Sequence, residues 1–250
     1  MTIATSLIPV IYRRLKPLDV KLAVPVRLLV LIGGGEFSFG ETREIDEYLV
    51  RNMEPDRKTI AFLPTASGSA EYAVHLGNYF KQIDSAIETI NVPIYRGRDV
   101  RRAKNLNQLR SAGMIYVGGG VTNTFLMTMR DSPAELAMRD AADYGSVIAA
   151  IGAGAASFGV HARDMQSVAS ALPALGWIEQ TAIETAFDPQ DDTMMRRLMS
   201  LPDVKLGIGI PPKTAIAVHN DGSTTVLGSG SIAVFRMGSG LTPFGQASCY

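Results

Sequence analysis

The chain has 250 residues, of which 46% are apolar and 19% are charged, and this composition is typical of one large α/β domain. Its 24 basic and 24 acidic residues cancel, so charge favours neither a nucleic-acid backbone nor an anionic membrane surface as a partner. The single cysteine, Cys249, cannot form an internal disulfide, which suits a reducing cytoplasm. No apolar run reaches the ~18 residues that span a bilayer. We therefore predict a soluble cytoplasmic protein with no nucleic-acid or membrane partner.

Residues 1–26 are predicted to form an N-terminal arm ahead of a single domain at 27–250. Pro9, Pro17 and Pro25 exclude one continuous helix over the arm. We expect the arm to pack on the body of the chain or on a second subunit, with disorder as the alternative. A second copy of the chain is therefore one candidate partner.

From Arg27 onward, apolar β-branched runs alternate with helical patterns. Strands are predicted at 27–32, 58–63, 113–117 and 147–151, an extended segment at 87–95, and helices at 41–53, 70–83, 105–111, 123–130 and 133–144. This alternation predicts a three-layer α/β sandwich around a mostly parallel sheet. Near the C-terminus, segments 214–219, 224–227 and 232–235 are predicted to form antiparallel hairpin strands.

The turns that follow the predicted parallel strands are the expected ligand site. In an open parallel sheet, ligands bind at the carboxyl ends of the strands. The turns after Ile32, Leu63, Val117 and Ile151 are therefore expected to meet at one cleft.

The stretch from Ser146 to Gly159 is the most informative part of the sequence. A buried-strand pattern at 147–151 is followed, from Gly152 to Ala156, only by glycine and alanine. A strand that ends in a sharp turn of tiny residues before a helix is the layout of a nucleophile elbow. Gly152 stands where the nucleophile would be, and it has no side chain.

This stretch resembles the elbow of the dipeptidase E and cyanophycinase family of serine peptidases, whose pattern is Gly-x-Ser-Ala-Gly-Ala. Ala150 takes the position of the first glycine, and Gly152 takes that of the serine. Further matches lie in order at 31–36, 62–68, 115–125 and 207–215. The resemblance implies a class I glutamine amidotransferase-like fold and hydrolysis of aspartyl peptides without a metal or other cofactor.

The same resemblance assigns the other catalytic positions. The family's histidine segment matches 182–187, where Ala186 occupies the histidine position. Asp164 resembles the family's acid, although an exposed aspartate is also common without any catalytic role. Because loss of a triad nucleophile or base removes about a millionfold in rate, the main hypothesis is a non-hydrolytic protein that binds a small peptide or amino-acid-like ligand.

Backbone donors do not depend on the lost side chains. The amides near Gly119, Gly120 and Ala153 are predicted to form an oxyanion site that binds a carboxylate or carbonyl oxygen. The family-like turns also carry further candidate ligand-binding residues, which are Glu36, Thr65, Ser67, Asn123 and Thr124.

The alternative hypothesis is an active hydrolase with relocated catalytic groups. Ser157, His161 and Asp164 are spaced four and three residues apart, so they would share one face of a continuous helix. Ordinary polar neighbours on a helix would show the same spacing. A third hypothesis is a purely structural or assembly role.

The histidines give no metal-site spacing. His75, among apolar residues, is predicted to be a packed helix residue, and His219 beside a hairpin turn is predicted to be structural.

Overall fold

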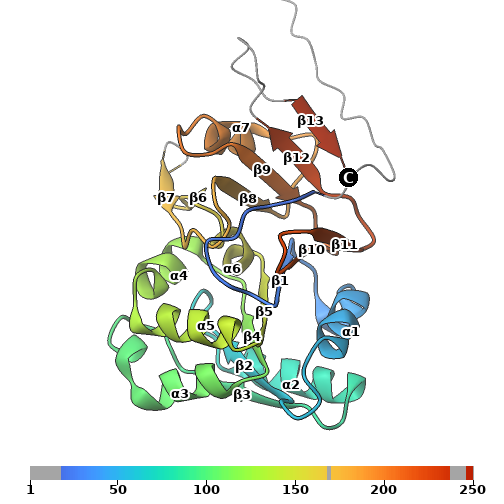
Figure 1. The fold of residues 1–250 in the computed structure, drawn as a ribbon, viewed down its shortest axis with the longest axis vertical. Helices are drawn as coiled ribbons and strands as arrows, with labels where there is room; N and C mark the ends of the chain where they lie inside the picture. The colour runs from blue at the N-terminus through green and yellow to red at the C-terminus, as the bar shows by residue number, and fades with distance from the viewer. Residues whose placement is uncertain (1–17, 168–169, 237–245, 250) are drawn as a thin grey trace, which may run out of the picture.

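The structure is a computed structural model, and it describes residues 18–167, 170–236 and 246–249 (Figure 1). Two sheets organise this part of the chain. A seven-stranded sheet has the order β11-β10-β1-β5-β4-β2-β3, and a six-stranded sheet has the order β13-β12-β9-β8-β6-β7.

The seven-stranded sheet is the predicted central sheet. Its strands are β1 (Leu28–Ile32), β2 (Thr59–Leu63), β3 (Glu88–Asn91), β4 (Met114–Val117), β5 (Val147–Ile151), β10 (Thr214–His219) and β11 (Thr224–Gly228). The neighbours from β1 through β5, β4 and β2 to β3 pair in parallel, while β10 and β11 are antiparallel. The prediction of a mostly parallel sheet is confirmed.

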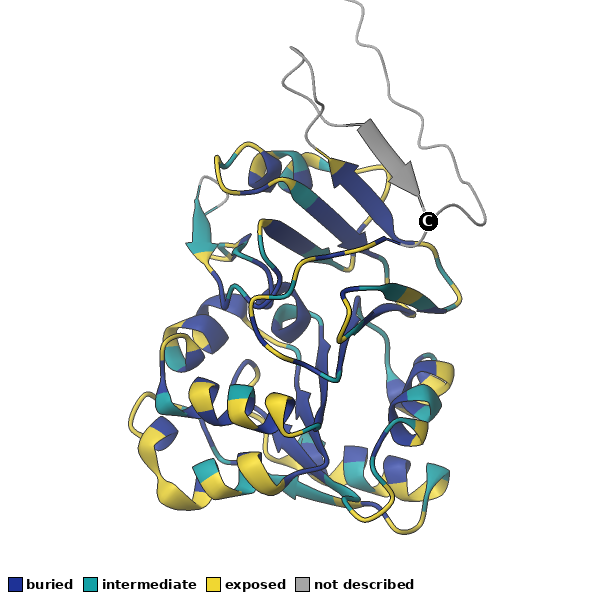
Figure 2. Ribbon diagram, viewed as in Figure 1, coloured by how far each residue is buried: buried dark blue, intermediate teal, exposed yellow. Residues whose placement is uncertain are grey.

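Helices cover both faces of this sheet (Figures 1 and 2). They are α1 (Arg43–Arg51), α2 (Glu71–Ile83), α3 (Ala103–Ser111), α4 (Thr122–Met129) and α5 (Pro133–Asp143), with short 3₁₀ turns η1 (Phe37–Phe39) and η2 (Asp99–Arg101). Alternate residues of β1 face opposite sides: Val30 packs with α1 and α2, and Leu31 packs with α3, α4 and α5. This arrangement is the expected three-layer sandwich.

The six-stranded sheet was not predicted as a separate sheet. Its strands are β6 (His161–Arg163), β7 (Ala171–Pro173), β8 (Thr181–Thr185), β9 (Leu206–Ile210), β12 (Ala233–Arg236) and β13 (Gln246–Cys249). Helix α7 (Thr193–Met199) packs against it through Met195 and Met199.

The C-terminal hairpin prediction is correct for two of its three strands. β10 and β11 form a hairpin, but β12, predicted at 232–235, pairs with β9 in the other sheet. The reason is that β12 is apolar on both faces: Val234 packs into the main core, and Phe235 packs under α7. A strand with two apolar faces needs cover on both sides, which an exposed hairpin edge would not provide.

The described end of the N-terminal arm packs on the body of the same chain. Leu22 forms a bridge with Ile178, the Val20 N–H donates to the Gly222 carbonyl at 2.9 Å, and Leu18, Val20, Val24 and Val26 are buried. The rest of the predicted arm, residues 1–17, lies outside the described residues. Across the described ranges, no helix has both the length and the apolarity to cross a bilayer.

Candidate functional site

The β5–α6 turn has the backbone of a nucleophile elbow. β5 ends at Ile151, helix α6 (Ala153–Ala156) begins directly afterwards, and Gly152 between them has φ 57° and ψ −124°. The Gly152 N–H donates to the carbonyl of Ile32 at 3.0 Å, which fixes the turn to the end of β1. The sharp turn expected at this position is therefore present.

Close backbone approach explains why the helix begins with tiny residues. A Cβ atom added to Gly154 would lie 2.8 Å from Val117 Cγ1 and 2.9 Å from the Gly118 carbonyl oxygen. Real Cβ atoms essentially never approach so closely, so only glycine fits there without a shift of the β4 turn.

Gly152 differs from Gly154, because the space beside it is open. A Cβ atom at Gly152 would have one heavy atom within 4 Å, the Cα of Gly119 at 3.8 Å. A Cβ atom at this position would therefore meet no clash. Its cost would come from the positive φ, which non-glycine residues rarely adopt.

The position assigned to the histidine lies at the same strand end. The Ala186 N–H donates to the carbonyl of Gly33 at 2.7 Å, next to the Ile32 carbonyl that accepts from Gly152. Ala186 is exposed and has φ 50°, in the left-handed region. The fold thus brings together two positions that are far apart in the sequence, and both hold residues without a functional side chain.

Four strand ends meet at one cavity, as the sequence predicts. The cavity, called here the elbow cavity, has a volume of about 260 Å³. It is lined by Gly34 and Gly35 after β1, by Ser67, Ser69 and Tyr72 after β2, by Gly118 and Gly119 after β4, by Ile151, and by Phe62 of β2.

The predicted site residues are placed unequally around this cavity. Ser67 and Gly119 line it, and Ala153 is the half-buried first residue of α6. Gly120 packs against Ala66, where a Cβ atom would lie 2.4 Å from the Ala66 carbonyl oxygen. The role of the Gly119, Gly120 and Ala153 amides as oxyanion donors stays a prediction.

Three further candidates lie outside the cavity lining. Thr65 is buried, and its hydroxyl donates to the Ile94 carbonyl at 2.8 Å. Thr124 is exposed on α4. Asn123 is buried and bridges to the loop after β6, since its Nδ2 donates to Asp164 at 2.8 Å and its Oδ1 accepts from the Met165 N–H at 2.9 Å.

Asp164 is held by a set of hydrogen-bond donors. Its carboxylate accepts from the Asn123 amide, from the Ser170 hydroxyl at 2.6 Å and from the Gln166 N–H at 2.8 Å. These bonds, that of Asn123 first, lower the pKa of Asp164 to about 2. Its observed contacts organise a loop, and its role as a catalytic acid stays a prediction.

The continuous helix that would place Ser157, His161 and Asp164 on one face is absent from the described structure, so that expectation is wrong. α6 ends at Ala156, and His161 lies in strand β6. The helix ends because Gly159 passes so close to β8 that its Cβ atom would lie 2.4 Å from the Thr181 carbonyl oxygen.

The side chains of that proposed triad have other partners. Ser157 is fully buried, and its hydroxyl donates to the Ala153 carbonyl at 2.8 Å. His161 Nε2 lies 2.9 Å from the Asp203 carboxylate. A buried serine bonded to its own helix and a histidine turned to another acid do not form a nucleophile–base pair.

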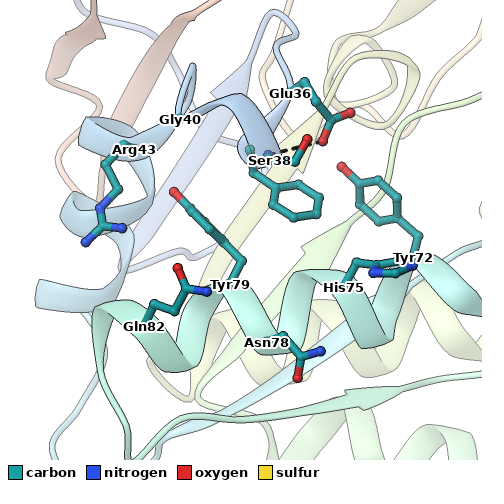
Figure 3. A pocket seen from close by; sticks show the side chains of 10 residues that line it. Glu36, Ser38, Gly40, Arg43, Tyr72, His75, Asn78, Tyr79 and Gln82 are labelled. Atoms are coloured by element: carbon teal, nitrogen blue, oxygen red, sulfur yellow. Dashed lines mark hydrogen bonds between the residues drawn. The ribbon is translucent and has the colours of Figure 1, made fainter.

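A second, larger pocket adjoins the elbow cavity through Tyr72. This pocket, called here the η1–α2 pocket, has a volume of about 630 Å³ (Figure 3). It is lined by Glu36, Phe37, Ser38, Gly40, Arg43, Tyr72, His75, Asn78, Tyr79 and Gln82. His75 is exposed here, so its prediction as a packed residue is wrong: the helix turns Leu76, not His75, toward the core.

Tyr72 is the residue that sequence reasoning missed. It lines both cavities, and burial together with the charge of Glu36 raises the pKa of its hydroxyl to about 12. The available signal was an aromatic residue in the first turn of the helix after the second strand, directly following a turn already assigned to the cleft. Within the described ranges, no three His, Cys, Asp or Glu side chains gather as metal ligands would.

Comparison with known proteins identifies the family of this chain. The profile of Peptidase family S51 matches residues 29–226. The chain belongs to this family. The family S51 assignment confirms the resemblance to the dipeptidase E family that the sequence motifs carry.

One curated protein and one solved structure are similar to this chain. "Uncharacterized peptidase YgaJ" of Bacillus subtilis (strain 168) is 28% identical over 158 residues, which span 62% of this chain and 66%, just under two thirds, of that protein. The crystal structure of a peptidase from an acI-B1 Actinobacterium superposes with a TM-score of 0.70 at 21% identity, covering 89% of this chain and 93% of that one. The second likeness confirms the fold.

Proposed function

We propose that this family S51 chain is a non-hydrolytic protein that binds a small peptide or amino-acid-like ligand in the elbow cavity. The observation that carries the proposal is the backbone conformation of Gly152 together with the open space beside it. Its backbone has the elbow conformation, and open space lies where a nucleophile would project. The backbone turn of the elbow is present, whereas a nucleophilic side chain is absent at Gly152.

The chemistry of the site supports binding rather than hydrolysis. A serine peptidase needs a nucleophile, a base that takes its proton, and donors for the oxyanion. Gly152 offers no nucleophile, and the Ala186 methyl group cannot act as a base. Loss of either group in a cooperating triad removes about a millionfold in rate.

The backbone can still hold an oxygen atom of a ligand. Ala153 is the first residue of α6, so its N–H has no acceptor within the helix. Together with the amide of Gly119, which lines the elbow cavity, it forms the candidate donor pair for a carboxylate or carbonyl oxygen. A cavity of about 260 Å³ suits a ligand group of about one amino-acid residue.

The first experiment combines three readouts on the purified protein. Aspartyl dipeptides and cyanophycin are offered as substrates, a serine-directed fluorophosphonate probe tests for a reactive hydroxyl, and thermal unfolding reports binding. We expect no turnover and no labelling, together with a rise in melting temperature with at least one ligand, because ligands that bind only the native state stabilise it. Turnover accompanied by labelling would overturn the proposal.

A cavity-filling variant locates the binding. Ser69 is exposed and lines the elbow cavity, so Ser69→Trp fills the cavity from its rim without disturbing the core. We expect the ligand-dependent rise in melting temperature to disappear. The matched control is Ser111→Trp at the exposed end of α3, which should keep the full rise.

A restoration variant tests whether the cleft still has the peptidase geometry. Gly152→Ser combined with Ala186→His refills the two empty positions, and we expect fluorophosphonate labelling to appear. A double variant that neither labels nor binds aspartyl peptides would show that the cleft no longer accepts this class of ligand.

A further inference from the structure

We propose that the η1–α2 pocket binds an organic cation, an ammonium or guanidinium group, between the Glu36 carboxylate and the aromatic rings of Phe37 and Tyr72. The inference rests on the proposed function only in assigning this cation to the ligand that also occupies the elbow cavity. The cation site itself stands on the residues of the pocket.

Glu36 supplies the charge. Its carboxylate is half-exposed, lines the pocket, and accepts a long bond of 3.4 Å from the Ser38 N–H. The nearby acid Glu41 is occupied, since it pairs with Lys213 at 2.7 Å. Among the described residues Glu36 forms no ion pair of its own, so its negative charge is available to a ligand.

The aromatic rings supply the second half of the site. The ring of Phe37 lies 5.3 Å from that of Tyr72 and 5.1 Å from that of Tyr79, measured between centroids. Figure 3 shows the Tyr72 hydroxyl directed toward Glu36. Aromatic faces beside a carboxylate attract organic cations through both the ring quadrupole and the charge.

One cation of the chain already contacts the aromatic group formed by Phe37, Tyr72 and Tyr79. The Arg43 guanidinium lies 5.9 Å from the centroid of the Tyr79 ring and is paired with Glu47 at 2.6 Å. Figure 3 places Arg43 at the end of the pocket away from Glu36. The Tyr79 end is therefore occupied by Arg43, and the Glu36 end remains for a cation from outside the chain.

The aromatic group also connects the two cavities. Tyr72 lines both of them, and its ring lies 5.5 Å from that of Phe62 in the elbow cavity. A ligand that places an oxygen atom on the elbow amides could therefore extend along Tyr72 and place a cation beside Glu36. The geometry points to peptides that carry a free amino group or a basic side chain.

Small probes test the cation site directly. Butylguanidinium and butylammonium carry the two cation types, and butylurea is a neutral molecule of nearly the same shape as the former. We expect both cations, but not butylurea, to bind the wild-type protein in an NMR titration that follows residues of η1 and α2. Glu36→Gln should weaken cation binding by about tenfold or more, because it removes a charge-assisted contact.

A matched control separates this contact from general electrostatics. Glu71 is an exposed acid that neighbours Tyr72 on α2 but does not line the pocket. Glu71→Gln removes the same charge and should change cation affinity by no more than about twofold. Equal cation affinities in wild type and Glu36→Gln, or equal binding of butylurea and butylguanidinium, would overturn the inference.

Peptides then distinguish this inference from the proposed function and identify the source of the cation. N-acetylated peptides with a basic side chain are compared with free-amine peptides without one, in wild type, Glu36→Gln and Ser69→Trp. Peptide binding that is lost in Ser69→Trp but unchanged in Glu36→Gln supports the proposed function and refutes the assignment of the cation to the peptide ligand. Probe binding that depends on Glu36 in a protein that binds no peptide supports the cation site and refutes the proposed function.

Discussion

The elbow cavity and the η1–α2 pocket share Tyr72 but differ in what their walls are made of. Glycine backbone forms much of the elbow wall, at Gly34, Gly35, Gly118 and Gly119. The η1–α2 pocket is walled by ionisable and aromatic side chains from η1, α1 and α2. The wall of the elbow cavity is thus mainly backbone, whereas the wall of the neighbouring η1–α2 pocket carries charged side chains.

This difference predicts different effects of substitutions on stability and on binding at the two sites. A backbone-walled site depends on close approach between strands, so substitution there should damage stability before binding. A side-chain-walled site sits on the surface of helices that fold without it, so substitution there should change binding before stability. The following predictions test this contrast, beginning with the largest effect.

The largest effect is expected at Gly154. Gly154→Val places its Cβ atom 2.8 Å from Val117 Cγ1 and 2.9 Å from the Gly118 carbonyl oxygen, so the β4 turn must move. We expect a loss of about 3 kcal/mol in the free energy of unfolding, measured by chemical denaturation. Gly97→Ala is the control, because nothing lies within 4 Å of its Cβ position. Unchanged stability in Gly154→Val would contradict the close packing of the elbow.

The second effect is a pH dependence of folding stability that arises at Asp46, next to the pocket residue Tyr79. Asp46 is buried, accepts hydrogen bonds from Thr42 and Tyr79, and has a pKa raised to about 6, chiefly by burial. The folded state therefore holds the proton of the Asp46 carboxyl group more tightly than the unfolded state does. The contribution of this group to folding stability is complete below the unfolded pKa near 4 and is lost as pH rises through 6. The two-unit shift corresponds to about 3 kcal/mol.

Asp46→Asn isolates this contribution. The variant cannot ionise at position 46, so the difference in unfolding free energy between wild type and variant should move in favour of the variant as pH rises from about 4 to about 7. Denaturation curves across this range measure the difference. A constant difference at all pH values would mean that Asp46 titrates normally.

A smaller effect is expected at the elbow position itself. Gly152→Ser has room for its side chain but must adopt φ 57°. We expect a loss of about 1–2 kcal/mol from backbone strain, with the fold retained. Thermal unfolding and near-UV circular dichroism measure this cost, and a loss as large as that of Gly154→Val would show that the space beside Gly152 is closed.

The smallest effect concerns Asp164. Its pKa is lowered to about 2 by hydrogen bonds from Asn123, Ser170 and Gln166, so its stabilising contribution is present above the unfolded pKa and is lost as pH falls through about 2. Asp164→Asn should be slightly less stable than wild type at neutral pH. That gap should close in acid, and thermal unfolding at both pH values measures it.

Much of the central sheet could be predicted because its signals are local. The run Val147–Ile151 is apolar throughout, as a strand buried on both faces requires. The glycine and alanine residues that follow, from Gly152 to Ala156, indicate a sharp turn in close contact with the neighbouring strands. The second sheet was harder to predict, since β6 and β7 have three residues each, too few to establish a period.

The site was predictable to the extent that it depends on backbone. Gly119 and Ser67 follow strand ends, and the topology of a parallel sheet brings strand ends together. Thr65 follows the end of β2 even more closely than Ser67, and Asn123 lies in the helix after β4, yet the Thr65 hydroxyl bonds to the Ile94 carbonyl and the Asn123 amide bonds to Asp164. No sequence spacing reveals which of two neighbouring polar residues turns inward.

The sequence by itself determined the family, the parallel core and the absence of a functional side chain at Gly152, because these follow from residue identity and local apolar pattern. Only the tertiary structure decided that Ser157 is buried and that His161 lies on a strand, since the helix is ended by Gly159 meeting β8. It also decided that Glu36 lies beside Tyr72, because η1 and α2 are placed together by the packing of Phe37, not by any signal within either segment.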